Sequence, residues 1–321
     1  MRRPLLWLAL ALATALPLSL LAGRVWIDPL NPAIAGAPVI LLELRLPRAL
    51  LALVVGAGLG GAGAAMQGYL RNPLADPGLF GIAPGAALGA VTALLASATA
   101  IWTVPAAALA GAAAAMALLA LIAGRTAGVA VFTLAGMMIA SLAGALTTLA
   151  ISLAPNPFAL SEVVTWLMGA LTDRSWRDVW IAAPPTVLGL ALLQRAGRDL
   201  DAFILGEDAA RSLGVEPARL QATMIAGVGL TVGAGVAVAG IIGFVGLMVP
   251  HLMRGFTDRR PSQLILPSAL AGSLLVLVAD CLCRVLPLAG GELRLGIGLS
   301  LLGAPFFLAL LVRMRTSTGS A

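Results

Sequence analysis

The sequence predicts an all-α protein that crosses a membrane as a polytopic bundle of about ten helices. Of its 321 residues, 60% are apolar and only 11% are charged, whereas soluble domains average about 45–50% and about 25%. The mean hydropathy is +1.02. A soluble chain of this length cannot hide so much apolar surface in one core, so a bilayer must be the solvent for much of its exterior.

Ten apolar stretches, separated by Arg, Asp, Asn and Pro, set the predicted spans. A hydrocarbon core about 30 Å thick needs about 20 helical residues. The predicted spans lie near 5–27, 48–70, 85–104, 105–124, 129–154, 177–197, 220–240, 241–255, 263–283 and 294–313. The whole chain, 1–321, then forms a single transmembrane domain.

The first stretch has two interpretations. Two Arg followed by an apolar run are typical of a cleaved signal peptide. The run continues to Ile27, however, which is longer than a typical signal core and favours an uncleaved first span.

The distribution of Arg predicts the orientation, because inner loops of membrane proteins are enriched in basic residues. With the N-terminus inside, thirteen of the twenty Arg fall at inner ends of spans and seven at outer ends. Both termini are therefore expected in the cytoplasm.

Small residues point to close helix packing and to an internal repeat. Gly56, Gly60 and Gly63 have the spacing that lets helix backbones approach in a membrane. The runs Val55–Gly58 and Val232–Gly235 both read Val-Gly-Ala-Gly, which suggests that spans two to five and seven to ten form an inverted repeat.

The composition excludes several kinds of chemistry. All basic residues are Arg, so a phosphate-loop Lys and a Schiff-base Lys are both excluded. One His and two Cys cannot build a tetrahedral metal site unaided. No paired-carboxylate or Ser–His–Asp cluster gathers in one place. We expect no catalytic residue, no metal and no cofactor; the scattered Arg also do not suggest nucleic acid.

Two polar segments flank the second span. Glu43 to Arg48 precedes it on the outside, where Pro47 suits the first turn of a helix. Arg45 and Arg48 lie three residues apart, and either snorkel at the interface or contact an acidic partner. Arg71 to Gly78 follows the span on the inside, where two Pro and a Gly predict an irregular reversal, either a plain turn or a gate.

Arg195 to Arg219 is the longest charged stretch, and short cytoplasmic helices are predicted within it at 198–219. Leu205 to Gly214 is expected to form a short helix, with acids in its first turn and Gly214 capping its end. Another helix should open at Pro217. A small capped knob of this kind is suited to plug into a cytoplasmic partner, although a solvated loop is the alternative. Further along, the single His251 is expected to be a hydrogen-bonded structural residue.

These segments, in this order, resemble the permease subunits of ABC importers for iron-siderophore complexes, haem and vitamin B12. The resemblance covers nearly the whole chain. The matching phrases are Leu44 to Arg48, Gln67 to Gly81, Trp166 to Gly169 with Trp176, Leu205 to Val215, Gly243 to Leu247, Pro250-His251, Asp258 to Arg260, Ala279 to Arg284 and Gly303 to Phe306. The chain departs from the family at Arg294, where Pro is usual.

The resemblance implies a homodimer in the bacterial inner membrane, embedded in lipid. It also implies two cytoplasmic ATP-binding subunits and a periplasmic substrate-binding protein. By the same resemblance, Arg45, Arg48 and Arg284 dock the binding protein, and Asn72 and Leu74 belong to the inner gate. The residues that would couple the chain to the ATPase are Leu205, Gly206, Glu207, Ala209, Arg211, Leu213 and Gly214.

The expected function is therefore import of an iron chelate, either haem or a ferric siderophore, powered by a separate ATPase. A corrinoid such as vitamin B12 is the alternative cargo. An ion-coupled secondary transporter is a rival, weakened because the centres of the spans are nearly free of charge. A membrane enzyme is a more distant third.

Overall fold

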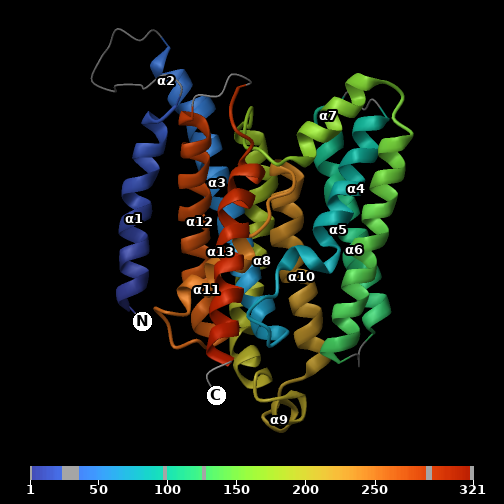
Figure 1. The fold of residues 1–321 in the computed structure, drawn as a ribbon, viewed down its shortest axis with the longest axis vertical. Coiled ribbons are helices and arrows are strands. Elements are labelled where there is room, and N and C mark those ends of the chain that lie inside the picture. The colour runs from blue at the N-terminus through green and yellow to red at the C-terminus, as the bar shows by residue number, and fades with distance from the viewer. Residues whose placement is uncertain (1, 24–35, 97–99, 125–127, 287–290, 319–321) are drawn as a thin grey trace.

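The computed structural model describes residues 2–23, 36–96, 100–124, 128–286 and 291–318, and every regular element in them is a helix. Ten helices follow the order of the ten predicted spans, which confirms the fold class (Figure 1). They are α1 (Arg2–Leu21), α3 (Leu46–Tyr69), α4 (Ile82–Leu95), α5 (Thr103–Ala123), α6 (Val129–Ser152), α8 (Trp176–Phe203), α10 (Pro217–Ala239), α11 (Val245–Met253), α12 (Pro261–Val285) and α13 (Leu295–Thr318).

The short elements connect these helices. They are α2 (Ala37–Val39), the π-helix η1 (Ile40–Arg45), the 3₁₀ helix η2 (Pro77–Phe80), α7 (Pro157–Leu167) and α9 (Glu207–Ser212). The sequence did not predict α7, which Asn156 caps by accepting a hydrogen bond from the Ala159 N–H at 2.9 Å. In Figure 1, α9 lies at the same end as the first turn of α1 and the last turn of α13. We call this end the inner end, following the predicted orientation.

Two of the predicted spans do not cross the bundle as helices. Within the described residues, seven helices are long and apolar enough to span a membrane; α4, α11 and α13 are not among them, and the apolar part of α13 covers Leu295–Leu310. The predictions of full spans at 85–104 and 241–255 were wrong, because α4 ends at Leu95 and α11 has only 9 residues. Nine residues rise about 14 Å, roughly half of a hydrocarbon core. The first predicted span also ends early, with α1 at Leu21, and 24–27 lie outside the described residues.

The two short helices, α4 and α11, both begin inside the bundle, after a residue in the left-handed conformation. α4 starts midway and rises to the outer end, whereas α11 descends towards the inner end (Figure 1). Their N-caps are Gly81, with φ 79°, and Phe244, with φ 67°. Phe244 pays a steric penalty that Gly81 avoids. Gly303 accommodates the Phe244 ring, because a Cβ on Gly303 would overlap it. We call these two N-caps, Gly81 and Phe244, the breaks. They lie in corresponding places of the predicted repeat, and α4 and α11 run in opposite directions.

Pro47 is the second residue of α3 and lies in its first turn, as the sequence predicted, but other helical turns precede it, so the helical stretch runs without a break from Ala37 to Tyr69. The preceding turn is π-helical, and the Leu46 N–H bonds to the Leu41 carbonyl five residues back. Pro47 has no N–H to continue this pattern to the Leu42 carbonyl. The indole of Trp176 donates to that carbonyl instead, at 3.1 Å.

α3 forms the axis of the bundle, and its closest neighbour is α12. Gly56 and Gly60 meet the backbone of α12 at Gly272 and Ser268, where a Cβ on either glycine would overlap a carbonyl. The Ser273 hydroxyl of α12 donates to the Leu53 carbonyl of α3 at 2.8 Å. The predicted small-residue packing is therefore present in this pair of helices.

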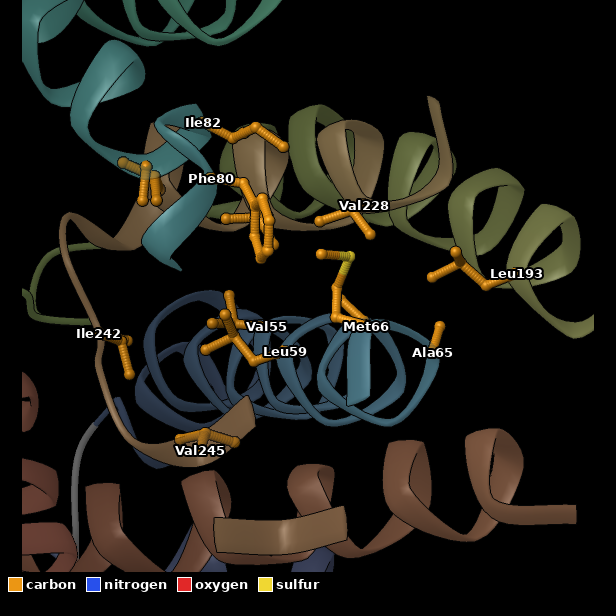
Figure 2. Close-up of a cluster of buried hydrophobic side chains, with 14 of the residues drawn as sticks. Val55, Leu59, Ala65, Met66, Phe80, Ile82, Leu193, Val228, Ile242 and Val245 are labelled. Carbon is orange, nitrogen blue, oxygen red and sulfur yellow. The ribbon is translucent and has the colours of Figure 1, made fainter. Parts of the chain in front are cut away.

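The opposite face of α3 contributes to an apolar core. Figure 2 shows Val55, Leu59 and Met66 of α3 facing Phe80 and Val228. These five side chains are each less than a tenth exposed. The core therefore joins α3 to η2 and α10, and it holds the reversal after α3 inside the bundle.

Candidate functional site

A central cavity lies between the two breaks. Its volume is 140 Å³, and its walls come from α3, η2, the start of α4, α10 and the segment Gly240–Gly243. Among the described residues of the lining, Asp76 alone is charged, and its Oδ1 accepts from the Gly78 N–H at 2.7 Å, which caps η2. The remaining walls are apolar residues, Gly and Pro. Such a surface offers a bound molecule few hydrogen bonds.

The predicted gate residues lie in the reversal at the inner end of α3. The Asn72 side chain accepts from the Leu74 N–H at 2.9 Å, and the Asn72 N–H donates to the Gln67 carbonyl at 3.1 Å. Asn72 is exposed and Leu74 is half-buried. Both residues stand two to four positions before Asp76 of the central cavity, in the segment that carries the chain from the inner end into the bundle.

Gln67, to which no role was predicted from the sequence, links the reversal after α3 to the start of α11. Its side chain is 1% exposed. Its amide nitrogen lies 3.2–3.3 Å from the carbonyls of Ala75, Gly246 and Leu247. Its amide oxygen accepts from Arg254 Nη2 at 2.9 Å. The feature of the sequence that could have indicated this role is that Gln67 is a single amide side chain in the apolar second half of α3.

At the outer end, the three Arg predicted to dock a partner come together in a charge cluster. Arg48 contacts Asp280 at 2.9 Å and Glu292 at 2.8 Å. Arg284 contacts the other oxygen of Asp280 at 3.1 Å. Asp280 is fully buried, and the side chains of Arg48 and Arg284 are only 11% and 4% exposed. We call Arg45, Arg48, Arg284, Asp280 and Glu292 the outer charge cluster.

Part of this cluster also holds the peripheral helix α1. Arg45 Nη1 donates to the carbonyls of Leu20 and Leu21, both at 2.8 Å, and Arg284 donates to the Ala22 carbonyl at 3.2 Å. Cations at a helix C-terminus stabilise the free carbonyls there. Asp280 and Glu292 could not be predicted as the counter-ions of Arg48, because they lie more than 200 residues from it in the sequence.

The cluster borders a cavity of 220 Å³ that also contains Asp173 and Arg174. Burial lowers the pKa of the Arg174 guanidinium, although the nearby Asp178 opposes this shift. Three Arg against two carboxylates leave the outer charge cluster with a net charge of +1, and the pair Asp173 and Arg174 leaves this balance unchanged. The cavity is therefore positively charged, but much less so than its Arg content suggests.

The predicted inner knob is present and shorter than expected. α9 spans Glu207–Ser212, and α8 continues to Phe203, so the first residues of the predicted 198–219 segment belong to α8. Arg211 pairs with Glu207 at 2.8 Å. Gly214, with φ 86°, ends the helix as predicted. Its N–H bonds to the Arg211 carbonyl and the next N–H bonds to the Ala210 carbonyl, which is a Schellman motif.

The knob displays apolar side chains at both ends. Leu205 is 68% exposed and Leu213 is 64% exposed, and both flank α9. Gly206 has φ 111° and Ala209 is half-buried, so the backbone of the knob is sharply turned and compact. Exposed leucines on a rigid, polar loop outside a membrane bundle are typical of a protein contact.

The chain is similar to transport permeases along nearly its whole length. Residues 9–313 match the model of the FecCD transport family. The chain is 37% identical over 98% of its length, and 96% of the relative, to the vitamin B12 import system permease protein BtuC of Escherichia coli O9:H4 (strain HS). It is also 37% identical to the protein of the same name from Shigella sonnei (strain Ss046), over 97% of this chain and 95% of that one.

One solved structure is similar along the whole chain. It is described as an inward-facing conformation of a putative metal-chelate type ABC transporter. The TM-score is 0.90 and the sequence identity is 29%, over 98% of this chain and 100% of that one.

Proposed function

Since this chain belongs to the FecCD transport family, and is thus a permease of type II ABC importers, we propose that its cargo is a corrinoid such as vitamin B12. The observation that carries this choice is the 37% identity, over nearly the full length of both chains, to permeases named for vitamin B12 import. It favours the corrinoid over the iron chelate that the sequence analysis preferred. An iron or other metal chelate is the second candidate, because the similar solved structure is described as a metal-chelate type transporter.

The working assembly in this proposal is a dimer of this chain in the inner membrane. Two ATP-binding subunits sit beneath it and a periplasmic binding protein sits above. The path for cargo is proposed to run between the two copies of the chain, at the dimer interface, because the central cavity within one copy, at 140 Å³, is too small for so large a solute. Tight binding would be a cost here, because a cargo held in the path must also leave it.

Asn72 and Leu74 are proposed as the inner gate of that path. They lie in the reversal between the inner end of α3 and the central cavity, where irregular backbone is tolerated only if protein or water surrounds it. Gln67 ties this reversal to the start of α11. A movement of α11 would therefore be passed directly to the gate.

The knob at Leu205 to Gly214 is proposed as the contact with the ATPase. When ATP draws the two ATPase subunits together, a rigid knob seated in each would move with them and carry α8 and α10, to which it is joined. Glu207 and Arg211 brace one face of α9, and Gly206 and Gly214 supply the turns at its two ends. The exposed Leu205 and Leu213 supply the apolar contact.

Reconstitution of the full importer tests both the cargo and the knob. In vesicles containing this chain, its ATPase and its binding protein, we expect ATP-dependent accumulation of cobalamin. Replacing both exposed leucines by Glu (L205E/L213E) should abolish uptake, because charge at an apolar contact opposes docking. The matched variant L205M/L213M keeps the apolar surface and should retain uptake.

Other outcomes are equally informative. If the vesicles accumulated haem or a ferric siderophore but no cobalamin, the second candidate, a metal chelate, would be the cargo. Accumulation by this chain alone under an ion gradient would contradict an ATP-driven importer. Normal transport in L205E/L213E would contradict the role of the knob.

The outer charge cluster is proposed as the docking surface for acidic residues of the binding protein. Replacing Glu292 by Gln raises the net charge of the cluster by one and leaves Asp280 paired with Arg48 and Arg284. We expect E292Q to speed association with the binding protein about two- to fivefold at low salt, with the difference shrinking as salt is added. Stopped-flow measurement of association checks this.

Glu162 on α7 provides the control, since it is exposed, lies at the same end and forms no part of the cluster. E162Q makes the same change in total charge and should alter the rate much less. Equal rates for E292Q and the unmodified chain would remove the docking role of the cluster.

A further inference from the structure

A second, larger cavity opens at the inner end of the bundle. Its volume is 760 Å³, and it lies between the inner ends of α3, α11 and α12. Three of its lining residues, Arg71, Arg254 and Arg259, are permanently cationic, and His251 is a fourth potential donor. No Asp or Glu is among the described residues that line it. We call this space the basic cavity.

Two of the three guanidinium groups are held in place by neighbouring side chains. The amide nitrogen of Gln67 donates to backbone carbonyls, and its amide oxygen accepts from Arg254 at 2.9 Å. The guanidinium carbon of Arg71 lies 5.9 Å from the centre of the Phe203 ring. Ordering a long side chain in advance removes part of the entropy cost of binding a ligand.

The backbone around the cavity is also strained. Only four described residues other than Gly have positive φ, and two of them line this cavity: Arg71, with φ 51°, and Arg259, with φ 61°. Such strain is found preferentially at ligand sites and switch regions.

The positive charge of the cavity has no counter-ion in the described residues. Burial lowers the pKa of Arg254, and repulsion by Arg259 lowers it further. Two acids lie near lining residues in the sequence, and neither lines the cavity: Asp201 accepts from the Ser262 N–H at 3.0 Å, and Asp258 is exposed. His251 Nδ1 is buried without a hydrogen-bond partner, so the prediction of a hydrogen-bonded His251 was wrong at this atom; the ring packs edge-on against Phe306 instead. A bound anion would neutralise part of the charge of Arg71, Arg254 and Arg259.

We propose that the basic cavity binds a phosphate group, carried either by an anionic phospholipid of the inner leaflet or by free inorganic phosphate. The planar guanidinium fork matches phosphate oxygens in pairs. Basic pockets between the inner ends of transmembrane helices are suited to anionic headgroups. The site is distinct from the central cavity and from the outer charge cluster, and it includes Arg71 and Pro73 of the reversal that carries the proposed gate.

The test uses the full chain in lipid nanodiscs. One arm compares discs of phosphatidylcholine with discs that also contain phosphatidylglycerol, and a second arm adds inorganic phosphate to phosphatidylcholine discs. The readout is the thermal unfolding temperature, titrated to obtain an apparent affinity. We expect R254Q/R259Q to weaken the affinity for the effective ligand about tenfold.

Arg195 and Arg198 supply the control, because both are exposed on the inner part of α8 and neither lines the cavity. R195Q/R198Q removes the same charge from the same end and should leave the affinity within twofold of the original. A second variant, R71Q/R259Q, leaves the Gln67–Arg254 bond intact and should also weaken binding, which covers the case in which R254Q/R259Q fails to fold.

A response to phosphatidylglycerol alone identifies lipid as the source, and a response to inorganic phosphate identifies the free ion. Absence of both responses overturns the proposal. Equal loss of affinity in the control variant also overturns it, since the effect would then belong to general surface charge.

Discussion

Replacing Asp280 by Asn should lower the free energy of unfolding by about 3–5 kcal/mol, the largest effect expected from any single substitution of a charged residue here. Asp280 is fully buried and lies between Arg48 and Arg284, whose side chains are themselves almost buried. Without the carboxylate, two desolvated cations face each other with only Glu292 to balance them. Thermal unfolding of the detergent-solubilised chain measures the loss.

The matched control is D208N, because Asp208 is fully exposed on α9 and the same atoms are exchanged. It should leave the unfolding temperature unchanged. The double variant D280N/R48Q removes one of the stranded cations and should recover part of the loss. If D280N is as stable as the original chain, the outer charge cluster contributes nothing to folding.

Replacing Gly56 and Gly60 by Ala should force α3 and α12 apart. A Cβ at either position overlaps a backbone carbonyl of α12, at Gly272 or Ser268, and backbone cannot rotate away as a side chain can. Overpacking of this kind costs about 2–3 kcal/mol per site. The double variant G56A/G60A should therefore unfold at a clearly lower temperature, and the bond from Ser273 to the Leu53 carbonyl should be lost.

Gly144 on α6 provides the control, because no atom lies within 4 Å of a Cβ placed there. G144A should be neutral or slightly stabilising, as expected for Ala in place of Gly in a helix. If G144A lowered the unfolding temperature as much as G56A/G60A, contact between α3 and α12 would not explain why glycine is required at positions 56 and 60.

The sequence by itself determined the all-helical membrane class, the order of the ten apolar segments and the capped inner knob. These properties depend on local composition: apolar length predicts a span, and Gly214 after a short amphipathic segment predicts the end of a helix. It also placed Arg45, Arg48 and Arg284 at one end of the bundle. Each of these predictions needs only residues that are close together in the chain.

Only the tertiary structure decided how these segments meet. An apolar stretch has the same composition whether its helix crosses the bundle or ends halfway, so composition predicts full spans where the structure has the short helices α4 and α11. Likewise, Asp280 meets Arg48 and Gln67 meets Gly246 across more than 170 residues of sequence. Whether an Arg is free to meet another protein or is already neutralised depends on such long-range contacts, because at short range in a low dielectric the nearest opposite charge dominates.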